Sequence, residues 1–138
     1  TPYPTLFPYT TLFRSIKEFR VSLGGYQYGF PAGLMDIGET VEQTGKRELF
    51  EETGLTLTRV LKKSPAIFSS SGMTDESISL LFVECEGSPT SLFNEASEDI
   101  EVIMLSQKQA LDILCSNTIK FDVKSWIVLN TFASQGVI

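Results

Sequence analysis

Apolar and polar residues alternate over short stretches of this chain, a pattern typical of strands that bury one face. Apolar runs rich in Val, Ile, Leu and Phe also indicate strands, and the strongest run lies within residues 77–86. The segments expected to form strands are 16–23, 26–30, 55–61, 66–68, 77–86 and 100–105. Gly24 and Gly25 form a two-residue turn signal, so we expect the first two strands to pair as a hairpin.

One helix is marked at both of its ends. Thr40 is followed three residues later by Gln43, a pair that can form a capping box at a helix start. Gly54 suits the left-handed residue that commonly follows a helix end. We therefore expect a helix over residues 41–53, and Gly45 within it would allow a close approach to a sheet.

Two more helices are expected near the end of the chain. Ser106 and Gln109 form a second capping-box pair, before a helix that runs to about Asn117. Asp122 can cap a last helix that runs through Phe132. The residues expected to be buried on that helix are Trp126, Val128 or Leu129, and Phe132. Strands and helices thus interleave irregularly, which predicts an α/β domain with a mixed sheet between helices.

The composition narrows the functional classes. The chain has 138 residues, 42% of them hydrophobic, and no apolar run approaches the ~20 residues of a membrane span. A net charge of −6 argues against broad contacts with nucleic-acid phosphates, although bound metal ions could still attract a small anionic substrate. The absence of histidine excludes serine–histidine, cysteine–histidine and histidine–metal chemistry. Cys85 and Cys115 have no metal-site spacing, so we expect a reduced, cytoplasmic protein.

Residues 1–15 are treated separately from the fold. The stretch TLFPYTTLFRS, residues 5–15, has no helical or strand period and looks like an in-frame translation of a sequencing-library adapter oligonucleotide. It also lacks the basic start and continuous apolar stretch of a secretory signal peptide. We expect residues 1–15 to be a non-native segment, with a natural disordered arm as the alternative, and residues 16–138 to form the domain.

Acidic side chains are concentrated on one side of the helix expected over residues 41–53. Glu48, Glu51 and Glu52 share an arc of about 100° at the 3.6-residue helical period. Like charges one turn apart cost about 0.2–0.5 kcal/mol per pair, and no basic residue follows them before Arg59. A solvated acidic face is one interpretation. A bound divalent cation is the other, because it would remove the repulsion and because oxygen ligands suit Mg²⁺ or Mn²⁺.

The segment from Gly33 to Leu55 fits the pattern G-x5-E-x7-R-E-U-x-E-E-x-G-U, where U is an aliphatic residue. The pattern resembles the Nudix box, the signature of hydrolases that cut a nucleoside diphosphate linked to another group. Segments on both sides of the box are similar to those of ADP-ribose and ADP-sugar pyrophosphatases. They are KEFR (17–20), GGY (24–26), FPAG (30–33), GMTDE (72–76) and EDIEV (98–102). The resemblance implies a Nudix-like α/β/α sandwich with a mixed β-sheet.

The resemblance also implies a metal site. In this subfamily the carbonyl before the box glycine and two box glutamates hold Mg²⁺, with Mn²⁺ as an alternative. The corresponding positions are Ala32, Glu48 and Glu52. Glu51 would take part through a further metal ion or an ordered water, so Glu51 and Glu52 are expected among the catalytic residues.

Other roles follow from the same likeness. A glutamate in the late acidic segment is the base in several members, and Glu98 is the matching position, with Glu95 as a weaker alternative. Arg20 would contact the diphosphate; an exposed strand arginine without that role is the alternative. Arg47 and Glu39 are expected to orient the box by pairing with acidic or backbone groups.

The function implied is Mg²⁺-dependent hydrolysis of ADP-ribose or a related nucleoside diphosphate sugar, giving AMP and a sugar phosphate. Two alternatives stay open. One is a Nudix hydrolase of nucleoside triphosphates, dinucleoside polyphosphates or NADH, and the other is a non-catalytic nucleotide-binding module. The expected partner is the small substrate, without nucleic acid or membrane. Full-length relatives would be homodimers with an additional N-terminal sheet, which we expect this chain to lack, impairing its dimerisation and substrate binding.

Overall fold

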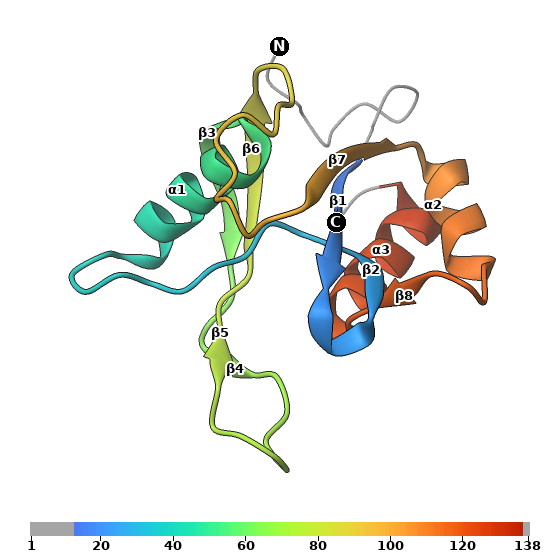
Figure 1. Cartoon of the computed structure of the whole chain (residues 1–138), viewed down its shortest axis with the longest axis horizontal. Coiled ribbons are helices and arrows are strands. Elements are labelled where there is room, and N and C mark those ends of the chain that lie inside the picture. Colours follow the sequence, from blue (N-terminus) through green and yellow to red (C-terminus); the bar gives the residue numbers. More distant parts are fainter. Residues whose placement is uncertain (1–12, 137–138) are drawn as a thin grey trace.

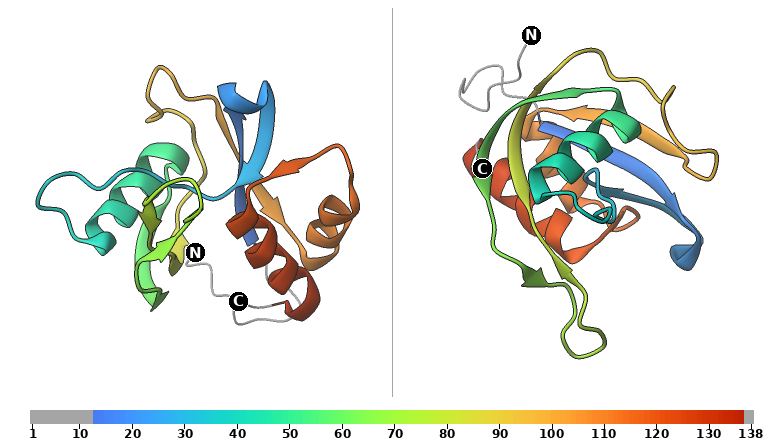
Figure 2. Two further views of the ribbon diagram at one scale, coloured as in Figure 1. Left: turned by 90° about the horizontal axis from the view of Figure 1, so that it is seen from below. Right: turned by 90° about the vertical axis from the view of Figure 1, so that its left-hand side faces the viewer.

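The computed structural model describes residues 13–136 of the chain (Figure 1). These residues form three layers, with a central sheet between one helix on one side and two helices on the other (Figure 2). This is the α/β/α sandwich that the sequence predicts. Within residues 13–136, no helix is both long enough and apolar enough to cross a membrane.

The central sheet has the strand order β7-β1-β2-β8. Its strands are β1 (Phe13–Arg20), β2 (Gly25–Gly29), β7 (Ile100–Leu105) and β8 (Lys120–Phe121). β1 pairs antiparallel with β2 and with β7, whereas β2 and β8 run parallel. The sheet is therefore mixed, as predicted, and β1 lies between two hydrogen-bonded neighbours.

The helices occupy opposite sides of this sheet. α1 (Val41–Thr53) lies on one side, while α2 (Gln107–Cys115) and α3 (Val123–Gln135) pack against each other on the other side (Figure 2). Buried apolar residues join α2 and α3 to the end of β7. They are Leu105, Ala110, Leu129, Phe132 and Ala133. Burial of Leu129 and Phe132 confirms the expected core face of the last helix.

Two pairs of outer strands complete the fold. β3 (Thr56–Lys63) pairs antiparallel with β6 (Leu81–Glu86), and β4 (Ile67–Phe68) pairs antiparallel with β5 (Ser77–Ile78). The single strand expected over residues 77–86 is thus divided. The division falls at Leu80, whose N–H donates to the Ser64 hydroxyl at 2.8 Å and whose carbonyl accepts from Ser64 N at 2.9 Å. The close approach expected at Gly45 of α1 is confirmed, because a Cβ at this position would meet the Leu81 side chain of β6.

Alternation along β1 decides which residues face α1. Ser15 lies opposite Ile103, and Ile103 packs against the core under α2 and α3. Successive strand side chains point to opposite faces of a sheet. Ile16, Glu18 and Arg20 therefore point to the other face, toward the layer that holds α1, and Ile16 is buried there.

The structure corrects the predicted hairpin. A short 3-10 helix (Val21–Leu23) and Gly24, in the left-handed conformation at φ 59°, connect β1 to β2. The connection is therefore longer than a two-residue turn. β1 also starts at Phe13, three residues before the expected position, and residues 1–12 lie outside the described part of the chain.

Trp126 was expected to be buried, and this prediction is wrong. Its relative exposure is 45%, because it lies at the edge of the buried face of α3 rather than at its centre. The two-residue strand β8 was not predicted, since a pairing this short leaves no alternation to detect.

Candidate functional site

The helix expected from the Nudix-like pattern forms as predicted. Gln43 N donates to the Thr40 hydroxyl at 3.2 Å, and Thr40 N donates to the Gln43 side chain at 2.9 Å, completing the capping box. Gly54 ends the helix at φ 72° and donates to the Phe50 carbonyl at 2.8 Å. α1 is thereby fixed at both ends.

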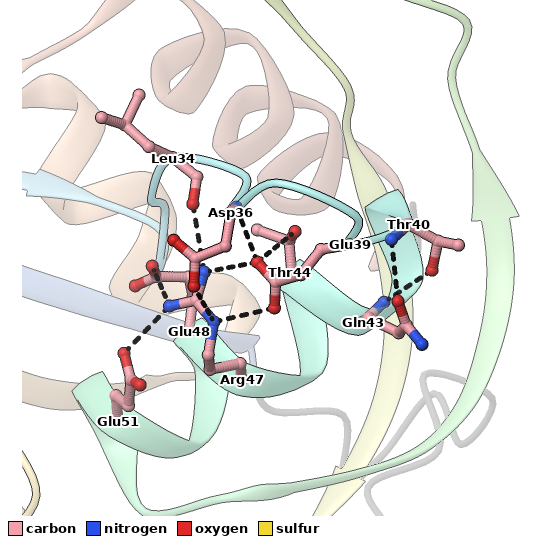
Figure 3. Close-up of polar contacts among 9 residues, drawn as sticks. All are labelled: Leu34, Asp36, Glu39, Thr40, Gln43, Thr44, Arg47, Glu48 and Glu51. Carbon is pink, nitrogen blue, oxygen red and sulfur yellow. Dashed lines mark hydrogen bonds and ion pairs between the residues drawn. The ribbon is translucent and has the colours of Figure 1, made fainter.

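Arg47 is the centre of a polar network on α1 (Figure 3). Its Nη1 donates to Glu48 Oε1 at 2.8 Å and to Glu51 Oε2 at 3.3 Å. Its Nε and Nη2 donate to the two carboxylate oxygens of Glu39 at 2.9 and 2.8 Å, and Nη2 also donates to the Leu34 carbonyl at 3.1 Å. Arg47 and Glu39 therefore pair with each other and with a backbone carbonyl, as expected for residues that orient the box.

This network corrects the argument from charge repulsion along the helix. No basic residue follows the glutamates before Arg59, but Arg47 precedes them and forms ion pairs with Glu48 and Glu51. Within residues 13–136, no basic side chain forms an ion pair with Glu52. Glu52 is therefore the box acid on α1 that has no ion-pair partner among these residues.

Glu52 is an acid in an environment that opposes its ionisation. Its relative exposure is 4%, and its Oε2 accepts a hydrogen bond from Ala32 N at 3.2 Å. Burial raises its pKa to about 8, and the negative charges of Glu18, Glu48 and Glu98 add to this effect. Without a bound cation, Glu52 is therefore largely protonated near neutral pH.

Glu18 is a member of this carboxylate group that the sequence analysis did not identify. Burial raises its pKa, the adjacent Arg20 lowers it, and the charge of Glu98 raises it again. Arg20 Nη2 lies 3.2 Å from Glu18 Oε2, and the Arg20 side chain is half-exposed. Strand spacing could have identified Glu18. Residues 18 and 20 share one face of β1, so Glu18 lies on the same side as Arg20, the expected diphosphate contact.

Gly33, the first residue of the box, is required by a close approach. A Cβ at this position would lie 2.0 Å from the Cδ and Oε1 atoms of Glu48. The Glu48 carboxylate therefore occupies the space that a larger residue would fill. Burial raises the pKa of Glu48, while its hydrogen bond from Arg47 lowers it.

The two loop acids have different environments. Glu98 is half-buried, and its charge raises the pKa of Glu18, Glu48 and Glu52. Glu95 is exposed, and its N–H donates to Glu98 Oε2 at 2.8 Å. The structure thus brings Glu98 into the carboxylate group and leaves the Glu95 side chain outside it in solvent.

The donor chemistry of this group fits a hard divalent cation. Its side chains offer carboxylate oxygens, and burial raises the pKa of Glu18, Glu48 and Glu52, a cost that a bound cation would offset. Among the described residues, however, no three acidic, histidine or cysteine side chains converge closely enough to hold an ion. Arg47 holds the oxygens of Glu48 and Glu51, so cation binding requires these side chains to rearrange.

Comparison with known proteins gives a consistent result. The family profile described as "NUDIX domain" matches residues 13–124. An ADP-ribose pyrophosphatase of Bacillus subtilis is 35% identical over 112 residues, covering 80% of this chain and 59% of that protein. An ADP-ribose pyrophosphatase of Saccharomyces cerevisiae is 39% identical over 70 residues, covering 51% of this chain and 30% of that protein. The chain thus spans less than two thirds of the length of either relative.

A solved structure shares the fold. The crystal structure of a MutT NUDIX hydrolase from Burkholderia pseudomallei superposes with a TM-score of 0.58 at 20% sequence identity. The superposition covers 86% of this chain and 86% of that one. At this level of identity, the likeness is evidence for the fold alone.

The pKa of Glu52 generates a prediction about stability. Its folded-state pKa of about 8 lies above the ordinary value of 4.5, so the folded protein loses stability as pH rises between these values. Glu52→Gln removes this loss. In EDTA at pH 8, we expect the variant to be about 2–4 kcal/mol more stable to urea than the parent chain, with no difference near pH 4.5.

Glu42→Gln is the matched control, because Glu42 is paired with Lys63 at 2.7 Å and has a lowered pKa, caused first by that hydrogen bond. Relative to the parent chain, Glu42→Gln should gain no stability as pH rises. Equal unfolding free energies for Glu52→Gln and the parent chain at both pH values would show that Glu52 ionises normally.

Proposed function

Because the chain belongs to the Nudix family, we propose that it is a Mg²⁺-dependent hydrolase of ADP-ribose or a related nucleoside diphosphate sugar. The hydrolase reaction would release AMP and a sugar phosphate. Two kinds of observation support the proposal. The matched relatives from B. subtilis and S. cerevisiae are ADP-ribose pyrophosphatases, and the segments flanking the box resemble that subfamily.

The observation that carries the proposal is the environment of Glu52. A buried carboxylate with one hydrogen bond, surrounded by further carboxylates, is costly in a protein without a counterion. A solvated acidic face would not bury this residue. Divalent cations remove the cost, and a diphosphate is a substrate that needs such cations to offset its own charge.

The residues that would hold the cation are Glu48 and Glu52 of α1 and the main-chain carbonyl of Ala32, with Glu51 assisting. Bound Mg²⁺, or Mn²⁺ in its place, would supply positive charge at the diphosphate and lower the pKa of water. Arg47 would keep Glu48 and Glu51 in place through its ion pairs with both carboxylates. The hydrogen bond from Ala32 N to Glu52 connects the loop at the start of the box to the residues that would hold the cation.

The remaining steps belong to residues outside α1. Arg20 would bind a diphosphate oxygen through its guanidinium group, which Glu18 orients at 3.2 Å. Glu98 would accept a proton from the attacking water. The water oxygen forms a bond to one phosphorus as the bridging P–O bond breaks, and the leaving phosphate takes the electron pair. No covalent intermediate with the protein is needed.

The proposal predicts which substrates are cleaved. AMP release should be measured with ADP-ribose, ADP-glucose, NADH, ATP and a dinucleoside polyphosphate, in Mg²⁺ and in EDTA. We expect turnover of ADP-ribose or ADP-glucose in Mg²⁺ only, with Glu52→Gln as the blank. Turnover confined to NADH, ATP or the polyphosphate would assign another Nudix reaction. Full activity of Glu52→Gln, or of the parent chain in EDTA, would contradict the metal-site assignment.

The loop acids generate a separate prediction. Glu98→Gln should lower kcat by about 10²–10⁴-fold, which is the usual contribution of a general base. Glu95→Gln is the control in the same loop, and kcat should change by less than about threefold because its side chain is exposed. The reverse order of effects would transfer the role of base from Glu98 to Glu95.

A further inference from the structure

The loop over residues 87–99 connects β6 to β7 and carries Glu98. It is attached to two separate parts of the molecule, and these attachments hold both ends of the segment that contains the Glu95–Glu98 turn. The following inference rests on the proposed function, since it concerns how the expected base is positioned.

The first attachment joins the loop to the end of α1. Thr90 N donates to the Thr53 carbonyl at 2.8 Å, and the rings of Phe93 and Phe50 stack with centroids 4.7 Å apart. The Asn94 side chain, oriented so that both amide atoms are satisfied, donates to two main-chain carbonyls in the last turn of α1 at 3.0 Å. Helix ends leave such carbonyls without intrahelical partners, so this attachment also caps α1.

The second attachment joins the loop to the β1–β2 hairpin through Asp99. Phe19 N donates to the Asp99 carbonyl at 3.1 Å, which extends the pairing of β1 and β7 by one step. The Tyr26 hydroxyl donates to Asp99 Oδ2. The Tyr26 ring is held by an edge contact with Phe19, with centroids 5.4 Å apart, and by the Lys17 ammonium 4.8 Å from its centroid. The hydroxyl therefore belongs to a ring whose orientation is fixed independently.

The orientation of the Asp99 side chain affects the orientation of the neighbouring Glu98 side chain. Phe19 and Tyr26 are paired on β1 and β2, and they share the face of the sheet that carries Ser15. Asp99 continues the pairing of β7 with β1, so its side chain lies on the face of Tyr26, and the same alternation would place the preceding residue on the other face. That face carries Glu18, and the electrostatic effect of Glu98 on Glu18 agrees with this placement. Glu98 ends a turn that its N–H closes by donating to the Glu95 carbonyl at 3.0 Å, so Asp99 fixes the point at which this turn joins the strand.

We propose that Tyr26 is a positioning residue whose hydrogen bond to Asp99 keeps Glu98 on the α1 side of the sheet, beside Glu18 and Glu52. Asp99 transmits the effect because it is the neighbour of Glu98 in the chain. Tyr26 touches neither substrate nor reacting atoms in this role. It acts through the loop alone.

A kinetic cycle on the full chain tests the proposal. Tyr26→Phe removes the hydroxyl and keeps the ring, so we expect kcat to fall by roughly three- to tenfold, the effect of one hydrogen bond, while KM changes less than about twofold. In a Glu98→Gln background, the same substitution should have no further effect, because the residue being positioned is already inactive. Equal losses in both backgrounds would mean that Tyr26 supports the site by general stability, and would overturn the proposal.

Tyr28→Phe is the matched control. Tyr28 lies on the same strand and face, its ring packs edge-on against Phe121, and within the described residues its hydroxyl makes no hydrogen bond to the loop. Its kcat should be unchanged. Asp99→Ala should reproduce Tyr26→Phe, and the double variant should lose no more than either single variant. Additive losses in the double variant would overturn the proposal.

Hydrogen exchange tests the loop without any substrate. Tyr26→Phe should speed amide exchange over residues 95–99 by roughly three- to tenfold and leave α1 unchanged. Unchanged exchange over 95–99 would refute the attachment, and faster exchange with unchanged kcat would refute its role in the reaction. If no substrate is cleaved by the parent chain, the proposed function fails, and exchange alone decides whether Tyr26 holds the loop.

Discussion

Burial of carboxyl groups gathered between α1 and β1 is the constraint on which the site depends, and repulsion among these groups adds to it. The box helix places three glutamates on one arc, and the fold adds Glu18 from β1 and Glu98 from the loop before β7. Arg47 offsets part of this charge by pairing with Glu48 and Glu51. Glu52 has no such partner among the described residues and is also the most buried of the box acids, so its pKa rises the furthest.

The surrounding structure holds these charges together against their repulsion. A capping box and a left-handed glycine fix the two ends of α1, while the absent side chain of Gly33 leaves space for the Glu48 carboxylate. The loop that carries Glu98 is tied to α1 at one end and to the β1–β2 hairpin at the other. The loop that supplies Glu98 is therefore connected to α1 and to the β1–β2 hairpin by contacts that do not use the side chains of the clustered glutamates.

Local signals predicted the box helix and β7 with correct bounds, because a capping residue, a glycine or an alternating run identifies its own segment. Contacts between distant segments were not predictable in the same way. Tyr26 and Asp99 are separated by 73 positions, and only the strand register brings them together. Glu18 was overlooked because its role depends on which layer β1 faces. The apolar character of Trp126 suggested the core, whereas its place at the edge of the buried face of α3 depends on how that helix packs.

The most direct test of this view is the titration of the Glu52 carboxyl group, followed by carbon-13 NMR in EDTA and again in saturating Mg²⁺. Without metal, the group should titrate with a pKa near 8, as its burial among like charges requires. With Mg²⁺, the pKa should fall below the ordinary value of 4.5, because the cation favours the ionised form. An ordinary pKa in both conditions would contradict the view that Glu52 is the buried, unpaired carboxyl group around which the site is built.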